Sequence, residues 1–255
     1  MQNPAHRSAD RNGRYAVGAA VLRDGPHRHL DSGADRLVLR LGLRIRELLQ
    51  PDGHASIARL ARDVLDLVDH LALDRFDALG WSMGASVWWS FIDQYGTSRI
   101  RRFVAVDQPA AVAAVPWLTP EQRDSGAIFD VAGLLELGAA LAGPDGERVR
   151  DDFVRGMFCG DPDRDLIAFV AEQIKSTPAY AGVPLLYDHC AQDWRDVLPR
   201  VDVPTLVIGY EGSHVSPASQ QFIAGRIPGA RLHVSGVDRA RPPHIRPLPA
   251  QTVPG

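Results

Sequence analysis

The residue best suited to chemistry is Ser82, which stands in the stretch GWSMG at residues 80–84. A Gly-x-Ser-x-Gly pattern is short enough to occur by chance, so its surroundings decide what it means. A serine becomes an exposed nucleophile on a sharp strand-to-helix turn, and such a turn needs small residues two positions to either side. Gly80 and Gly84 occupy those positions. The alternative is a serine that only caps the following helix.

The residues that flank Ser82 predict the strand and the helix that such a turn requires. Residues 76–80 form a short, mostly apolar run, and residues 83–95 repeat apolar side chains at helical spacing before Gly96. We therefore predict that Ser82 occupies a nucleophile elbow. In that geometry the backbone N–H of Met83, at the start of the helix, can donate to a developing oxyanion.

The rest of the chain predicts further helices and strands in alternation. An amphipathic helix is expected over residues 57–71, with Ser56 as its N-cap. Short β-branched runs at residues 101–107, 204–209 and 230–235 predict strands. Strands that alternate with helices are typical of an α/β fold with a mostly parallel sheet that helices flank.

A long central segment carries helical patterns and predicts an inserted cap. Within residues 110–195 the stretches 131–143 and 163–175 have helical spacing, and no strand is expected there. We interpret the chain as a single domain, residues 1–255, whose core comprises residues 51–109 and 196–255. The helical cap is expected to cover one edge of the sheet.

Composition limits the classes of partner. The chain has 255 residues, 45% hydrophobic and 23% charged, which is ordinary for one globular domain. A net charge of −3 gives no broad basic field, so we expect a small-molecule substrate rather than nucleic acid or membrane. The apolar runs are too short for a signal peptide or a membrane span, so we expect a cytoplasmic protein. Cys159 and Cys190 are expected to be buried free thiols.

These motifs together resemble the α/β-hydrolase family, and within it the esterase and cofactor-free haloperoxidase-like branch. The resemblance covers about residues 57–244. It rests on the helix before the elbow, on GWSMG, on the strand ending in VAVDQP and on VPTLVIG. It implies an α/β-hydrolase fold, a Ser–acid–His triad in that chain order, no metal and no organic cofactor.

The resemblance places the catalytic histidine in the loop after the last strand. A serine hydroxyl is weakly nucleophilic until a histidine accepts its proton. His244 stands in PPHIRPL, which resembles the family's loop of a histidine followed by an apolar residue, proline and leucine. His214 and His233 come earlier in the chain and are interpreted as loop and strand residues. The alternative is that His244 is a surface histidine.

The triad acid has two candidates. In most of the family an aspartate follows the strand that corresponds to VPTLVIG, but here those places hold Gly212 and Ser213, with Glu211 adjacent. Some members carry the acid at the end of the strand after the elbow helix, where Asp107 stands. A carboxylate that closes an apolar run needs a partner or solvent. We favour Asp107 over Glu211, although Asp107 could also simply cap the turn before Pro109.

The first fifty residues match the family poorly. An early strand of the family ends in a His-Gly pair whose following N–H completes the oxyanion hole, and residues 1–50 contain no such pair in a suitable place. Residues 37–49 instead alternate apolar residues with arginine, a pattern that predicts a half-exposed strand. Either this region has diverged heavily or it reflects a reading-frame disruption.

Three functions fit these observations. The first is a serine hydrolase that cleaves a small ester, thioester or lactone through an acyl-enzyme at Ser82, with His244, Asp107 and the Met83 N–H assisting. The second is perhydrolysis, seen as haloperoxidase activity, or C–C bond hydrolysis by the same triad. The third is a non-catalytic member of the fold. The substrate and the oligomeric state do not follow from the sequence.

Overall fold

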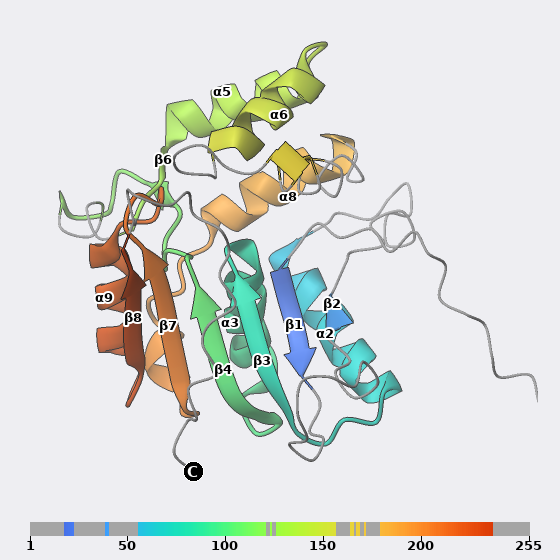
Figure 1. The fold of residues 1–255 in the computed structure, drawn as a ribbon, viewed down its shortest axis with the longest axis vertical. Helices are drawn as coiled ribbons and strands as arrows, with labels where there is room; N and C mark the ends of the chain where they lie inside the picture. The colour runs from blue at the N-terminus through green and yellow to red at the C-terminus, as the bar shows by residue number, and fades with distance from the viewer. Residues whose placement is uncertain are drawn as a thin grey trace, which may run out of the picture.

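The described part of the chain contains a six-stranded sheet beneath a group of helices (Figure 1). A computed structural model describes residues 18–22, 39–40, 56–120, 123, 126–156, 164–165, 167–168, 171 and 179–236. The strand order is β2-β1-β3-β4-β7-β8. These strands are β1 (Gly18–Leu22), β2 (Leu39–Arg40), β3 (Phe76–Trp81), β4 (Ile100–Val106), β7 (Thr205–Tyr210) and β8 (Arg231–Ser235).

The sheet is mostly parallel, as expected. β3, β4, β7 and β8 pair in parallel, whereas β1 runs antiparallel to β3 and β2 antiparallel to β1. The four predicted strands are confirmed, with bounds that differ from the sequence-based ranges by about one residue. Because the parallel strands all end at one edge, the residues that follow β3, β4, β7 and β8 are brought together there.

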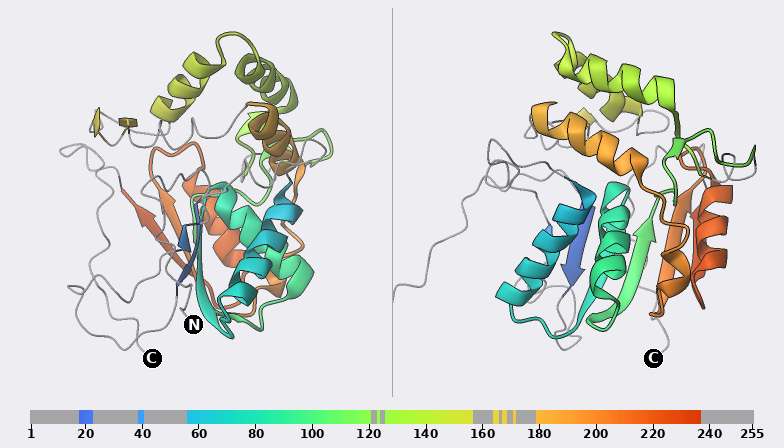
Figure 2. Two further views of the ribbon diagram at one scale, coloured as in Figure 1. Left: turned by 90° about the vertical axis from the view of Figure 1, so that its right-hand side faces the viewer. Right: turned by 180° about the vertical axis from the view of Figure 1, so that it is seen from behind.

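Three helices pack on one face of this sheet (Figure 2). They are α2 (Ile57–His70), α3 (Met83–Tyr95) and α9 (Pro217–Arg226). Ser56 is the N-cap of α2, as predicted, because its Oγ accepts a hydrogen bond from the backbone N of Arg59 at 3.2 Å. A short 3-10 helix, Leu198–Arg200, precedes β7.

The core lies between these helices and the sheet. Trp88 and Phe91 of α3 contact Phe76 of β3 through tilted and edge-on ring pairs, and all three side chains are at most 1% exposed. The Trp88 Nε1 donates to the Leu79 carbonyl at 2.9 Å, so the one polar atom of this ring is satisfied. These aromatic residues therefore hold α3 firmly against the strand that leads into Ser82.

A second group of helices lies above the carboxyl ends of the parallel strands (Figures 1 and 2). It contains α5 (Val131–Ala142), α6 (Gly146–Gly156) and α8 (Ala179–Ala191). The expectation of no strand in this segment is wrong: β5 (Ala113–Ala114) and β6 (Phe129–Asp130) pair in parallel as a separate small sheet. Two-residue strands are too short to show any alternation of apolar residues in the sequence, so no pattern could reveal them.

Helix α8 joins this upper group to the sheet layer. Asp188 Oδ2 accepts a hydrogen bond of 2.7 Å from the backbone N of Ile57, at the start of α2. The chain after α8 is fastened by the backbone hydrogen bond from Trp194 N to Ala110 O, at 2.8 Å. Cys190 of α8 is buried, as expected, and burial raises the pKa of its thiol to about 12. Cys159 lies outside the described residues.

Little of the first fifty residues is described. β2 falls within the segment for which the sequence predicts a half-exposed strand, and the rest of that segment lies outside the described residues. β1 is apolar, with the sequence GAAVL, and forms five residue pairs with β3. Among the helices of the described residues, none combines the length and the hydropathy needed to cross a membrane.

Candidate active site

Ser82 lies in a strained turn between β3 and α3. Its backbone has φ 51° and ψ −132°, a region that residues other than glycine rarely adopt. Its side chain is exposed, and within the described residues its hydroxyl makes no capping hydrogen bond to α3. The geometry matches the predicted strand-turn-helix arrangement, and it gives no support to the alternative that the serine serves only as a cap.

The small residues around Ser82 permit this turn. A Cβ atom built on Gly80 would lie 2.6 Å from the backbone N and Cα of Ala85, so no larger residue fits there without a shift of the backbone. The Ser82 carbonyl accepts a hydrogen bond from Ala85 N at 2.8 Å. Ser82 N donates to the Val106 carbonyl at 2.8 Å, which fixes the turn against β4.

Met83 is the first residue of α3. Its backbone N–H is one of those at a helix N-terminus that have no partner within the helix, and the partial positive charge of the helix dipole adds to it. The Met83 side chain packs against the core, whereas Trp81 on the other side of Ser82 is 43% exposed. The N–H thus lies beside the serine, and its role in holding an oxyanion stays a prediction.

Asp107 follows the neighbouring strand at the same level as Ser82. Trp81 pairs with Val106 in the parallel register, so the next residues, Ser82 and Asp107, leave adjacent strand ends. Asp107 also has a positive φ, 53°, and its backbone N donates to Ile208 O at 2.8 Å. Its Oδ2 accepts a hydrogen bond of 2.8 Å from Ser213 Oγ.

The carboxyl group of Asp107 is mostly removed from solvent. Burial raises its pKa above the ordinary value, and the Ser213 hydrogen bond and the His214 imidazole oppose that rise. Its Oδ1 is buried and has no hydrogen-bond partner among the described residues. Burial and the Asp107 carboxylate together raise the pKa of Tyr210, which places Tyr210 in the same neighbourhood.

Glu211, the other candidate acid, has different surroundings. It is exposed, and its backbone N donates to the Ser235 carbonyl at 2.9 Å. Its Oε2 lies 3.6 Å from the Cβ position that a side chain at Gly236 would take, so the carboxylate is directed toward the end of β8. The half-buried carboxylate of Asp107, which Ser213 holds by a hydrogen bond, fits the needs of a triad acid better than this exposed group.

The predicted base, His244, lies outside the described residues. β8 is parallel to β7 and ends at Ser235, so the chain leaves β8 at the edge where Ser82 and Asp107 lie. His214 is in the loop between β7 and α9, and His233 is on β8, as the sequence indicated. His214 Nε2 lies 2.8 Å from the carbonyl of Gly156, the last residue of α6.

Two polar contacts near Asp107 are not predicted by any pattern in the sequence. One is the hydroxyl of Ser213. The other joins the buried side chains of Gln108 and His189, whose Nε2 atoms lie 3.4 Å apart, and it connects the strand end to α8. Both contacts bridge residues more than 80 positions apart, and no local pattern predicts such pairs.

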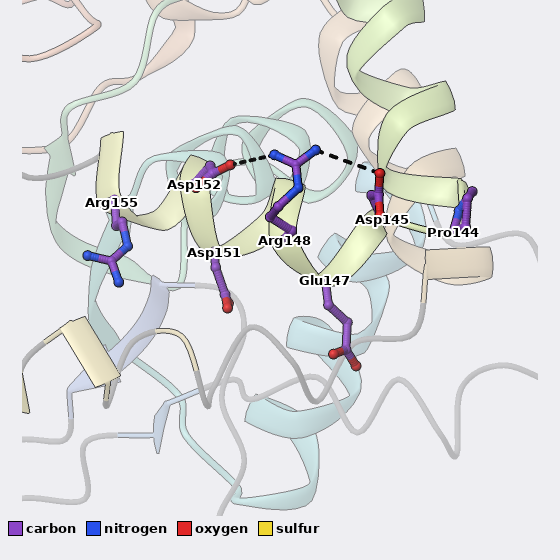
Figure 3. Close-up of a pocket in the computed structure, with 7 residues that line it drawn as sticks. All are labelled: Pro144, Asp145, Glu147, Arg148, Asp151, Asp152 and Arg155. Atoms are coloured by element: carbon purple, nitrogen blue, oxygen red, sulfur yellow. Dashed lines mark hydrogen bonds and ion pairs between the residues drawn. The ribbon is translucent and has the colours of Figure 1, made fainter.

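A hollow at α6 is lined by none of the candidate site residues (Figure 3). Its lining comprises Pro144, Asp145, Glu147, Arg148, Asp151, Asp152 and Arg155. Arg148 forms ion pairs with Asp145, just before α6, and with Asp152 in α6. All three side chains are more than 60% exposed. Such exposed pairs are a solvated helix surface rather than a reaction site. Among the described residues, no group of three or more His, Cys, Asp or Glu is arranged to hold a metal ion.

Comparisons with known proteins support the architecture. No protein-family model matches the sequence, and no curated protein matches it. Among solved structures, a bromoperoxidase from Bacillus anthracis is 21% identical with a TM-score of 0.65, and the match covers 74% of this chain and 68% of that one. An esterase from Exiguobacterium antarcticum is 19% identical with a TM-score of 0.63, covering 71% and 66%.

An enol-lactonase from Burkholderia xenovorans LB400 is 22% identical with a TM-score of 0.56, covering 72% of this chain and 65% of that one. The chain thus spans about two thirds of the length of these structures. The chain has the α/β-hydrolase fold.

Proposed function

We propose that this protein is a serine hydrolase that cleaves a small carboxylic ester, thioester or lactone. The observation that carries the proposal is the backbone of Ser82, held at φ 51° between β3 and α3 with its hydroxyl exposed. Strain of this kind persists only where the surrounding structure enforces it, and it is concentrated at functional sites. The elbow also sets the serine directly beside the first N–H of α3.

The proposed reaction has two halves. In the first, Ser82 Oγ attacks the substrate carbonyl carbon while the base takes its proton, and the oxyanion accepts a hydrogen bond from Met83 N–H. The tetrahedral intermediate collapses, the base returns the proton, and the alcohol or thiol leaves. In the second, water attacks the acyl-enzyme along the same route and releases the carboxylic acid.

The proposed acid, Asp107, and the proposed base, His244, are assigned on different evidence. Asp107 is supported by its place on the neighbouring strand end and by its buried Oδ1, to which a histidine N–H could donate. His244 is assigned from its position in the sequence after β8. In this scheme Asp107 fixes the tautomer of His244 and stabilises its cation.

A covalent probe tests the nucleophile directly. A fluorophosphonate reacts with activated serines and leaves unactivated serines unmodified. We expect peptide mass spectrometry to locate the adduct on Ser82 in the wild type and in Ser98→Ala, which removes an exposed serine just after the end of α3. Folded wild-type protein that stays unlabelled, or labelling that persists in Ser82→Ala, would contradict the proposal and favour a non-catalytic role.

A second reaction is proposed on the same residues, because a bromoperoxidase is among the similar structures. An acyl-enzyme attacked by hydrogen peroxide instead of water would give a peracid, which can oxidise bromide. Bromination of monochlorodimedone in acetate buffer with peroxide measures this activity. Ser82-dependent bromination faster than ester hydrolysis would assign the protein to perhydrolysis, and bromination that Ser82→Ala retains would exclude this route.

A further inference from the structure

The loop between β7 and α9 wraps around the carboxyl group of Asp107. Ser213 and His214 of this loop, and Tyr210 at the end of β7, interact with Asp107 by a hydrogen bond or electrostatically. Gly212 has φ 84°, so the loop turns sharply just before Ser213. This conformation brings the Ser213 side chain, 106 positions later in the chain than Asp107, to the end of β4.

The hydroxyl of Ser213 is fixed in orientation. Its Oγ accepts a hydrogen bond from the backbone N of Val215 at 3.0 Å, and it donates its single hydrogen to Asp107 Oδ2 at 2.8 Å. Val215 is buried, so the loop backbone that supplies the first contact is anchored. The hydroxyl therefore has one arrangement that satisfies both partners.

The two oxygens of Asp107 are thereby distinguished. Oδ2 is held by Ser213, and Oδ1 is buried with no partner among the described residues. A buried carboxylate oxygen needs a donor, and a triad acid must keep one oxygen for the histidine. The backbone of Asp107 is held as well, at φ 53° and with its N donating to Ile208 O at 2.8 Å.

We propose that Ser213 is a positioning residue, which holds the Asp107 carboxylate by Oδ2 so that Oδ1 remains directed at the catalytic base. This inference rests on the proposed function, because it assigns Asp107 as the triad acid. Ser213 touches neither the substrate nor the reacting atoms. A mostly buried carboxylate requires a hydrogen-bond partner besides the histidine. The neutral hydroxyl of Ser213 is that partner, and it donates to Asp107 Oδ2.

Substitution of Ser213 tests this role, with Ser216→Ala as the matched control. Ser216 lies in the same loop, and its Oγ caps α9 through Ser219 N at 3.2 Å, so its loss affects the loop without touching Asp107. We expect Ser213→Ala to lower kcat about 10- to 100-fold with little change in KM. Ser213→Thr, which keeps the hydroxyl, should recover most of kcat, and Ser216→Ala should keep wild-type kcat.

The pKa of Asp107 distinguishes a positioning role of Ser213 from a role in holding the loop structure. Loss of a purely structural contact would leave that pKa unchanged. Since the Ser213 hydrogen bond lowers the pKa of Asp107, its removal should move the carboxyl titration, followed by carbon-13 NMR, to higher pH. The acidic limb of kcat/KM should move in the same direction. Ser213→Thr should restore both.

The outcomes separate this inference from the proposed function. Wild-type kcat and an unchanged Asp107 titration in Ser213→Ala would overturn the inference while Ser82→Ala remains inactive. Equal losses in Ser213→Ala and Ser216→Ala would overturn it too, because the effect would then belong to the loop as a whole. Hydrolysis that survives Ser82→Ala would instead overturn the proposed function, and this inference with it.

Discussion

At the scale of single residues, the site is marked by its backbone. Among the described residues, three other than glycine have positive φ, namely Ala72, Ser82 and Asp107, and two of these stand at adjacent strand ends. Each such residue costs about 1 to 3 kcal/mol. The hydrogen bonds from Ser82 N to Val106 and from Asp107 N to Ile208 help to offset this cost. The strain thus coincides with the residues proposed to react.

Gly80 should tolerate no side chain, since its Cβ would meet the Ala85 backbone at 2.6 Å. We expect Gly80→Ala to lower the free energy of unfolding by about 2 kcal/mol or more and to reduce ester hydrolysis, because the Ser82 turn must move. Urea unfolding measures the first effect and initial rates measure the second.

The control for this change is Gly225→Ala. Gly225 lies in α9 with no atom within 4 Å of the added Cβ, so alanine should stabilise the helix by up to about 1 kcal/mol. A Gly80→Ala protein as stable and active as the wild type would show that the turn is looser than its geometry indicates.

At the scale of elements, α8 is the link between the upper helices and the sheet layer. Its Asp188 carboxylate accepts a hydrogen bond from the backbone N–H of Ile57, the first residue of α2. The Ser56 hydroxyl accepts one from the backbone N–H of Arg59, so each acceptor satisfies one N–H at the N-terminus of α2. A helix N-terminus favours a negative charge as well as an acceptor. The carboxylate of Asp188 therefore fastens one helix of the cap to the layer that carries Ser82.

Asp188→Ala should lower the free energy of unfolding by about 1 kcal/mol, because it leaves the Ile57 N–H without its partner. Asp188→Asn retains an acceptor oxygen and should lose less. Chemical denaturation of the two variants beside the wild type gives the comparison. If asparagine proves as costly as alanine, the contribution is the charge at the helix end rather than the hydrogen bond.

The local elements of this chain are predictable from its sequence, whereas its long-range contacts are not. The spacing of apolar residues located α2, α3 and the parallel strands, because each depends on a pattern within a few turns or residues. The pairing of Ser213 with Asp107 depends on how β4 and β7 are brought together in the sheet, and nothing in either stretch alone encodes it. The choice of Asp107 over Glu211 stays a prediction, and those contacts are the reason to favour it.

At the scale of the whole molecule, a buried histidine couples stability to pH. His189 of α8 is 6% exposed, and burial lowers its pKa from 6.5 to about 4. The Gln108 amide nitrogen, which faces His189 Nε2 at 3.4 Å, is a donor, so the neutral ring can accept from it whereas the protonated ring cannot. The folded protein therefore binds this proton less readily than the unfolded chain does.

Because His189 has a lower pKa in the folded protein than in the unfolded chain, the free energy of unfolding should fall at acidic pH. Stability from the neutral His189 is fully present above pH 6.5 and is lost as pH falls toward about 4, because the unfolded chain takes up a proton over this range. The loss amounts to about 3 kcal/mol. We expect His189→Gln to show a smaller fall in the free energy of unfolding between pH 7 and pH 4 than the wild type.

Urea denaturation at several pH values gives the two slopes. Asp63, Asp77 and Asp107 have pKa values that burial raises, and their contributions to stability change in the opposite direction, but they are common to both proteins. The difference between the proteins thus isolates His189. If the free energy of unfolding changes equally with pH in both proteins, the His189 ring is hydrated. In that case α8 does not keep water away from it.

The central claim, that Ser82 is a nucleophile, is tested most directly by hydrolysis of p-nitrophenyl acetate and butyrate by the wild type and by Ser82→Ala, with circular dichroism of both. If Ser82 is the nucleophile, the wild type turns over both esters, and the variant loses this turnover while keeping the same circular dichroism spectrum. Loss of a triad member commonly costs several orders of magnitude in rate. Equal turnover by the two folded proteins, or none by the wild type, would contradict this claim.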